Sequence, residues 1–211
     1  MTRRIIVAIT GASGIAYGVR AVEALASLKD IETHLIVSPS ARRTWKEEED
    51  GSDFEAIQSL ADVVHPYADV GASVASGSFK ADGLLVAPCS VKTLSGIVNC
   101  YADNLIVRAA DVCLKERRRV VLLLRETPLH LGHIDLMKRA TEAGAIIMPP
   151  VPAFYTKPQS LDDIVNQTVG RALDLFGIES GLAKRWKSTP ESAPMADPVP
   201  LTAGRQRHRS V

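Results

Sequence analysis

The sequence predicts an α/β fold of the Rossmann-like kind, a doubly wound and mainly parallel sheet with helices on both faces. Apolar runs of strand length alternate with segments of helical periodicity along the chain. The runs GLLVA at 83–87 and VVLLL at 120–124 are continuously apolar, so both faces of these strands are expected to be covered. Aromatic residues make up only 5% of the chain, which fits an aliphatic core between helices and a sheet.

The predicted elements follow one another in a regular order. Strands are expected at 4–9, 33–37, 83–87, 120–124 and 145–148, and helices at 15–28, 40–49, 54–61, 94–98, 105–114, 130–143 and 160–176. Together they form one domain, taken as 1–186. The remaining 187–211 is rich in Pro, Ser, Ala and Arg without apolar periodicity, and it is expected to be a disordered, solvated tail rather than a site for an anionic partner.

Composition and charge argue against several classes of protein. The net charge of +1 gives no electrostatic footprint for nucleic acid. Cys89, Cys100 and Cys113 form no CxxC pair, which argues against a disulfide framework or structural zinc and for a reducing, cytoplasmic compartment. No window approaches the roughly 18 apolar residues of a membrane span. The basic and then apolar N-terminus is better explained as a buried strand than as a signal peptide.

Ligands of doubly wound sheets bind at the carboxyl ends of the strands, so the residues after each strand are the first candidates. Gly11, Ala12, Ser13 and Gly14 lie between the first strand and the first helix. Small residues let the backbone approach a phosphate, and a helix N-terminus offers free N–H groups. The stretch matches neither GxGxxG nor a P-loop with its lysine. A flavin or nucleotide phosphate site and a plain tight turn therefore both remain open.

Hydroxyl side chains follow two further strands. Ser38 ends the second strand; it could meet the ribityl or ribose part of a ligand, although a helix cap is the favoured interpretation. Ser90 and Thr93 stand where a helix begins after GLLVA. They could hold a phosphate or a flavin edge, or Ser90 could simply be an N-cap. Cys89 is interpreted as packing, because the sequence places no histidine to activate it.

Charged residues follow VVLLL and occupy the helix before it. Arg125 could bind a phosphate or face a flavin carbonyl, and Glu126 could relay a proton; a structural Arg–Glu pair is equally open. Arg108 and Lys115 are seven residues apart, hence on one face of the predicted helix, and two cations there fit a phosphate leaving group. The three arginines at 117–119 are expected to form a solvated loop.

The last part of the chain offers three more candidates. Tyr155 lies in a proline-rich loop, PPVPAFY at 149–155, which could hold an aromatic ring over a site at little ordering cost. Arg171 lies in the last predicted helix and Trp186 just after it. Taken alone, each of these two would be assigned to the core or the surface.

Five stretches together resemble the UbiX-type flavin prenyltransferases over roughly 4–186. They are GASG at 11–14 with YGVR at 17–20, PCSVKTLSGI at 88–97, RAADVCLKERR at 108–118, RETPLHLGH at 125–133 and MPPVPAFYTKPQSLDD at 148–163. The order Ile15-Ala16 departs from the commoner Ala-Ile. The resemblance implies that dimethylallyl phosphate donates its prenyl group to reduced FMN without a metal, in a homododecamer with sites between subunits. It also implies a UbiD-type decarboxylase as recipient of the prenylated FMN.

The resemblance implies roles for particular residues. The residues that match FMN-binding positions are Gly11, Ala12, Ser13, Ser38, Ser90, Val91, Lys92, Thr93 and Arg125. Tyr155 and Arg171 match contacts to dimethylallyl phosphate, and Trp186 matches an aromatic residue near the site. Arg108, Lys115 and Glu126 match polar groups around the donor phosphate. Among Glu47, Glu48 and Glu49, Glu48 is taken as the family's glutamate after the second strand. The catalytic set is therefore Ser13, Glu48, Lys115 and Glu126, in which cations stabilise the leaving phosphate and Ser13 and Glu126 handle protons.

Other functions remain open on the same residues. A flavin-dependent cysteine decarboxylase of related fold would carry a PASANT-type stretch in place of PCSVKT at 88–93. The chain could also be an aromatic-acid decarboxylase or its subunit, or a flavin carrier without catalysis, although a carrier needs no second set of phosphate-binding cations. A Rossmann dehydrogenase is disfavoured, because GxGxxG is absent and Ser38 replaces the acidic residue expected after the second strand.

Overall fold

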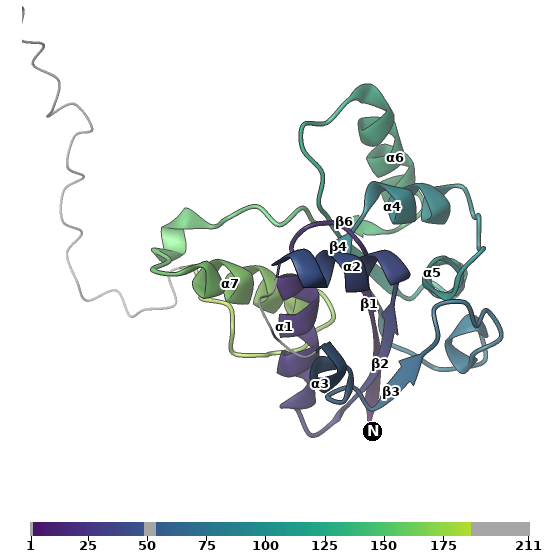
Figure 1. Cartoon of the computed structure of the whole chain (residues 1–211), viewed down its shortest axis with the longest axis horizontal. Helices are drawn as coiled ribbons and strands as arrows, with labels where there is room; N and C mark the ends of the chain where they lie inside the picture. The colour runs from purple at the N-terminus through teal and green to yellow at the C-terminus, as the bar shows by residue number, and fades with distance from the viewer. Residues whose placement is uncertain (1, 49–53, 187–211) are drawn as a thin grey trace, which may run out of the picture.

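The computed structural model describes residues 2–48 and 54–186. Its centre is a six-stranded sheet in the order β3-β2-β1-β4-β5-β6, and every neighbouring pair of strands is parallel. This is the doubly wound order, in which the chain reverses its direction of winding between β1 and β4. The predicted fold class is confirmed (Figure 1). Glu49 and the expected tail 187–211 lie outside the described residues.

The elements agree closely with the predicted order. The strands are β1 (Arg3–Ile9), β2 (Ile31–Val37), β3 (Val63–His65), β4 (Gly83–Cys89), β5 (Arg119–Leu124) and β6 (Ile146–Ile147). The helices are α1 (Ile15–Ala26), α2 (Pro39–Glu48), α3 (Phe54–Gln58), α4 (Val91–Val98), α5 (Leu105–Lys115), α6 (Leu131–Glu142) and α7 (Leu161–Asp174), with short 3₁₀ turns at Ser73–Ala75 and Phe154–Thr156.

Alternate residues of the central strands enter two separate cores, one on each face of the sheet. In β1, Ile5, Val7 and Ile9 pack with residues of α1 and α7, whereas Ile6 and Ala8 pack with residues of α4 and α5. All five are almost fully buried. Helices α1 and α7 lie side by side on one face, and α4 contacts both α5 and α6 on the other (Figure 1). Covering both faces explains why the strands are continuously apolar.

Three local features differ from the sequence prediction. Strand β3 was not predicted, because it has only three residues and lies at the sheet edge with Val64 half exposed. Strand β6 is two residues long rather than four. The loop expected at 117–119 is only partly solvated: Arg118 donates to the carbonyls of Phe79 (2.6 Å) and Gly77 (2.7 Å), and Arg119 begins β5. These two partly buried hydrogen bonds hold the Arg118 side chain against the segment 77–79.

Gly18 allows helix α1 to approach β4 very closely. A Cβ at Gly18 would lie 2.2 Å from the carbonyl oxygen of Ala87, so α1 crosses β4 at a distance that only glycine permits. The contact lies just before Pro88, Cys89 and Ser90, where β4 ends and α4 begins. Gly18 therefore fixes the start of α1 relative to the start of α4.

None of the helices in the described ranges is long and apolar enough to cross a membrane.

Replacing Gly18 by alanine is expected to destabilise the protein. At an exposed helical position this change adds roughly 0.5–1 kcal/mol of stability, but here the methyl group meets backbone, and overpacking of this kind costs about 1–3 kcal/mol. Urea denaturation of the flavin-free protein measures the difference. A Gly18→Ala variant as stable as the parent would show that α1 can move away from β4 freely.

Candidate functional site

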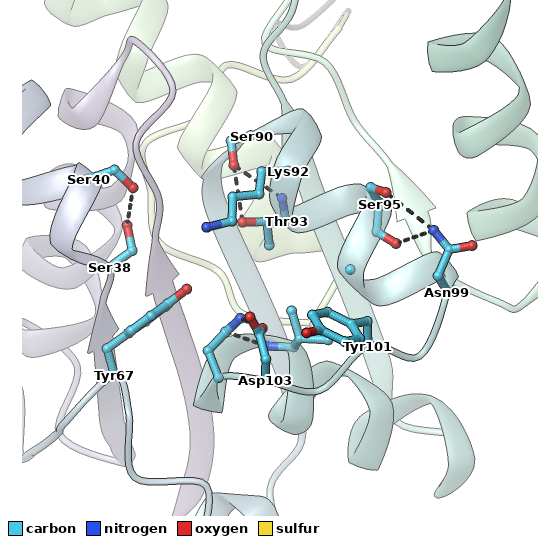
Figure 2. Close-up of a pocket in the computed structure, with 13 residues that line it drawn as sticks. Ser38, Ser40, Tyr67, Ser90, Lys92, Thr93, Ser95, Asn99, Tyr101 and Asp103 are labelled. Carbon is cyan, nitrogen blue, oxygen red and sulfur yellow. Dashed lines mark hydrogen bonds between the residues drawn. The ribbon is translucent and has the colours of Figure 1, made fainter.

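A cavity of about 450 Å³ opens at the carboxyl ends of β2 and β4. Figure 2 shows side chains converging on it from the end of β2, from the first turn of α4, and from the segment that leads into α5. It is lined by Ser38, Ser40, Tyr67, Ser90, Lys92, Thr93, Ser95, Gly96, Asn99, Tyr101, Asp103, Asn104 and Val107. Ser38, Ser90, Lys92 and Thr93, all expected from the sequence to hold a flavin, are thus brought together.

The first turn of α4 forms the polar wall of this cavity. Ser90 is the N-cap: its Oγ accepts the N–H of Thr93 at 3.3 Å and lies 3.1 Å from the Thr93 hydroxyl. Ser90 can therefore cap α4 and still leave this helix N-terminus able to bind a phosphate. A helix N-terminus with two hydroxyl groups and the ammonium of Lys92 beside it is suited to bind a phosphate.

Thr10, which the sequence reasoning missed, links the two strands that flank the switch point. Its buried hydroxyl donates to the Pro88 carbonyl (2.6 Å) and accepts the N–H of Ser90 (2.9 Å). The end of β1 is therefore tied to the residue that caps α4. The available signal was a threonine at the end of an apolar strand directly before Gly11, a position where a hydroxyl needs a buried partner.

The GASG turn is occupied by a carboxylate of the protein itself. Glu48, the last residue of α2, accepts the N–H of Gly14 with both oxygens (2.9 and 3.0 Å) and the N–H of Ile15 at 2.9 Å. Gly14 has a φ of 95°, which favours glycine. This carboxylate takes the place at the N-terminus of α1 where a phosphate was considered. The phosphate position is therefore better matched by α4.

At Gly11 the backbone comes close to α2 rather than to a ligand. A Cβ there would lie 2.4 Å from the Cβ of Ser40, and the Gly11 carbonyl accepts the hydroxyl of Thr44 at 3.1 Å. The turn is thus packed directly on α2. Ser38 acts both as a cap and as a cavity residue, because its buried Oγ accepts the N–H of Ala41 at 3.1 Å while the residue lines the cavity.

Arg125 and Glu126 leave β5 at the same edge of the sheet. The N–H of Arg125 donates to the Cys89 carbonyl at 3.0 Å, and its side chain is exposed. Glu126 accepts the N–H of Thr127 at 2.9 Å. No ion pair joins Arg125 to Glu126 among the residues that the structure describes, so the structural pair considered from the sequence does not form and both side chains are available to a ligand.

Arg108 and Lys115 do share one face of α5, as expected, but that face turns away from the cavity. Arg108 donates to the Ala75 carbonyl (3.2 Å) and pairs with Asp111 at 2.7 Å. Lys115 pairs with Glu116, which lowers the pKa of the Glu116 carboxyl. Helix α5 ends there, at the amino edge of the sheet, roughly 16 Å from the carboxyl edge along β5. Within one subunit Lys115 cannot reach the cavity.

The third group of candidates comes from two segments: Tyr155 lies on the loop before α7, whereas Arg171 lies in α7 and Trp186 follows it. Between β6 and α7 the chain extends away from the sheet (Figure 1). Tyr155 and Trp186 are in T-shaped contact, with ring centroids 5.1 Å apart; Tyr155 is half exposed and Trp186 is exposed. Arg171 pairs with Asp174 at 2.6 Å on α7. Tyr155 and Trp186 therefore form an aromatic pair outside the cavity lining, and Arg171 is paired separately with an acidic residue of its own helix.

The comparisons with known proteins define the class. The Flavoprotein family model matches residues 1–173, so the chain belongs to that family. A flavin prenyltransferase UbiX of Escherichia coli K12 is 57% identical over 88% of this chain and 98% of its own length. The chain is therefore a member of the UbiX-type flavin prenyltransferases, which are transferases.

Two solved structures have the same fold. The crystal structure of AnUbiX (PadA1) in complex with FMN and dimethylallyl pyrophosphate is 49% identical, with a TM-score of 0.86 over 90% of this chain and all of that one. A structure described as a dodecameric FMN-dependent UbiX-like decarboxylase from Escherichia coli O157:H7 is 45% identical, with a TM-score of 0.84 over 87% of this chain and 99% of that one.

Cysteine labelling tests the assignment of Cys89 as packing. Burial raises the pKa of the Cys89 thiol to about 12 and that of Cys113 to about 11, whereas Cys100 is exposed. A thiol reagent at pH 8 should therefore modify Cys100 in the native protein and all three cysteines after unfolding. Peptide mass mapping identifies the sites. Rapid modification of native Cys89 would contradict the assignment and make it a candidate nucleophile.

Proposed function

We propose that this flavin prenyltransferase binds FMN in the cavity at the start of α4 and transfers to it the dimethylallyl group of dimethylallyl phosphate. The observation that carries the proposal is the first turn of α4, with its capping hydroxyls and Lys92 open to the cavity. When bound, the reduced flavin supplies the nucleophile for prenylation at N5 and then C6. The prenylated FMN would serve a UbiD-type decarboxylase, and the reaction would take place in the cytoplasm.

The residues present fit the parts of FMN. The phosphate would lie on the N-terminus of α4, held by Ser90, Thr93 and the backbone N–H groups of Val91 and Lys92. Ser38, in the cavity wall, would meet the ribityl chain. Gly11, Ala12 and Ser13, at the neighbouring strand end, and Arg125 would border the ring system; the guanidinium of Arg125 is exposed and free to face a flavin carbonyl.

Prenyl transfer releases a phosphate, so a second set of cations is needed. Arg108, Lys115 and Arg171 have the charge to stabilise the leaving phosphate, and Tyr155 and Trp186 offer aromatic walls for an allylic cation. In one subunit these residues lie apart from the cavity. We infer that neighbouring subunits supply them, which agrees with a homododecamer such as the assembly named for the Escherichia coli O157:H7 relative.

Proton handling is assigned to residues around the GASG turn and the end of β5. Ser13 and Glu126 would move protons between flavin and phosphate. Glu48 would act from beside Ser13, since its carboxylate is fixed on the N–H groups of Gly14 and Ile15. Fixing a carboxylate in this way keeps its position defined while the substrate changes charge.

Two solved structures that are at least 40% identical to this chain are described as decarboxylases, so direct decarboxylation of an aromatic acid is the second candidate. Anaerobic incubation with reduced FMN and dimethylallyl phosphate, followed by mass measurement of the flavin, separates the two. A gain of one five-carbon prenyl unit with release of phosphate supports the transferase. Unmodified FMN with either the phosphate or the pyrophosphate donor would contradict it and favour the decarboxylase or a carrier.

Glu126→Gln is expected to bind FMN as tightly as the parent and to lose most of its turnover. The amide keeps the size of the side chain and the contact to Thr127 but cannot accept a proton, and general acid–base groups contribute roughly 10²- to 10⁴-fold. Fluorescence titration of FMN and product mass under anaerobic conditions measure the two properties separately. Full activity in this variant would remove Glu126 from the mechanism.

A further inference from the structure

The chain that follows α7 turns back and lies along that helix as a strap, defined here as residues 177–186. A Cβ at Gly170 would lie 2.6 Å from the backbone nitrogen of Ala183, so helix and strap are in direct contact. Arg185 of the strap pairs with both oxygens of Asp174 (2.6 and 2.8 Å). The strap ends at Trp186, whose ring packs on Tyr155. It therefore joins α7 to the loop that carries Tyr155.

Gln167 is the buried link between the three segments. Its Oε1 accepts the N–H of Lys184 at 2.7 Å, and its Nε2 donates to the Lys184 carbonyl (3.3 Å) and to the Tyr155 hydroxyl oxygen (3.4 Å). The side chain is 5% exposed. A backbone N–H can only donate, so Lys184 fixes which end of the amide is oxygen. The nitrogen must then face Tyr155.

This orientation determines what the Tyr155 hydroxyl can do. It accepts a hydrogen bond from Gln167, so its own proton is left to be donated elsewhere. Gln167 and Arg171 are four residues apart on α7 and hence on the same face of that helix. The Tyr155 hydroxyl, which contacts Gln167, and Arg171 are thus on the same side of α7, and both groups have N–H or O–H donors suited to an anion.

We propose that Gln167 is a positioning residue for the prenyl donor. Because its amide N–H occupies the oxygen of the Tyr155 hydroxyl, the hydroxyl proton is directed into a hydrogen bond with the phosphate of dimethylallyl phosphate. The inference rests on the proposed function and on the contact between Tyr155 and dimethylallyl phosphate that the resemblance to the family implies. The ring is also in T-shaped contact with Trp186, and Lys184 donates from Nζ to the carbonyl of Thr156, which follows Tyr155, at 3.2 Å. Gln167 therefore sets the direction of the hydroxyl on a ring that is already held in place.

Gln167→Glu is the sharpest test, because it replaces the donor by an acceptor of the same shape. The tyrosine would then donate to the carboxylate and could not donate to the phosphate. The dissociation constant for dimethylallyl phosphate, measured by calorimetry with oxidised FMN bound so that no turnover occurs, should rise at least about tenfold, the effect of losing one hydrogen bond to a charged group. FMN affinity should not change. Gln58→Glu on α3 is the matched control and should leave both values unchanged.

A double-mutant cycle with Tyr155→Phe separates positioning from a general structural effect. If Gln167 acts through the hydroxyl, Gln167→Glu should weaken donor binding less than about twofold once the hydroxyl is gone. Fully additive effects, or unchanged donor binding in Gln167→Glu, would overturn the proposal. If the Glu variant does not fold, Gln167→Met replaces it: the hydroxyl then loses its fixed direction but keeps its proton, so donor binding should weaken by a smaller factor than in the Glu variant. Unchanged donor binding in Gln167→Met, or a loss that persists in Tyr155→Phe, would overturn the proposal.

The parent protein distinguishes failure of this inference from failure of the proposed function. If the parent binds dimethylallyl phosphate but leaves reduced FMN unprenylated, the proposed function fails and the donor-affinity comparison still decides the role of Gln167. If the parent prenylates FMN and Gln167→Glu binds the donor normally, only the positioning role fails. If the parent does not bind the donor, both are overturned.

Discussion

The structure depends on how closely β1, β4 and α1 meet at the carboxyl edge of the sheet. The Thr10 hydroxyl bridges the Pro88 carbonyl and the Ser90 N–H, and Gly18 lets α1 rest on the Ala87 carbonyl. Both contacts act on the same few residues at the end of β4. They fix the position from which α4 starts, and with it the helix N-terminus that is best placed to hold a phosphate.

Two helix N-termini at this edge have different electrostatic surroundings. That of α1 is neutralised by Glu48, whose carboxylate accepts two of its N–H groups. That of α4 keeps its first N–H groups and the Lys92 ammonium for the cavity. A site that must bind one phosphate in FMN and release another from the donor benefits from this division, because an open anion site at α1 would compete for either phosphate.

The fold and the group of hydroxyl residues at the start of α4 could be predicted from the sequence because they depend on local signals. Continuous apolar strands set the sheet, and hydroxyl residues after a strand set the α4 cap. The remainder depends on contacts between distant segments. Nothing near Glu48 in sequence indicates that it would cap α1, and Gln167 has no local pattern that links it to Tyr155 and Lys184. Helical spacing placed Arg108 and Lys115 on one face correctly, but spacing cannot indicate which way that face turns.

The central claim is that the flavin cavity and the cations for the leaving phosphate come from different subunits. Co-expression of Lys115→Ala and Glu126→Ala chains with different tags, followed by purification of mixed oligomers, tests it directly. If sites lie between subunits, the mixture should recover up to about a quarter of parental prenyl transfer, the share of sites that receive both intact residues. Mixed oligomers no more active than either variant alone would contradict a shared site and require Lys115 to act within its own chain or not at all.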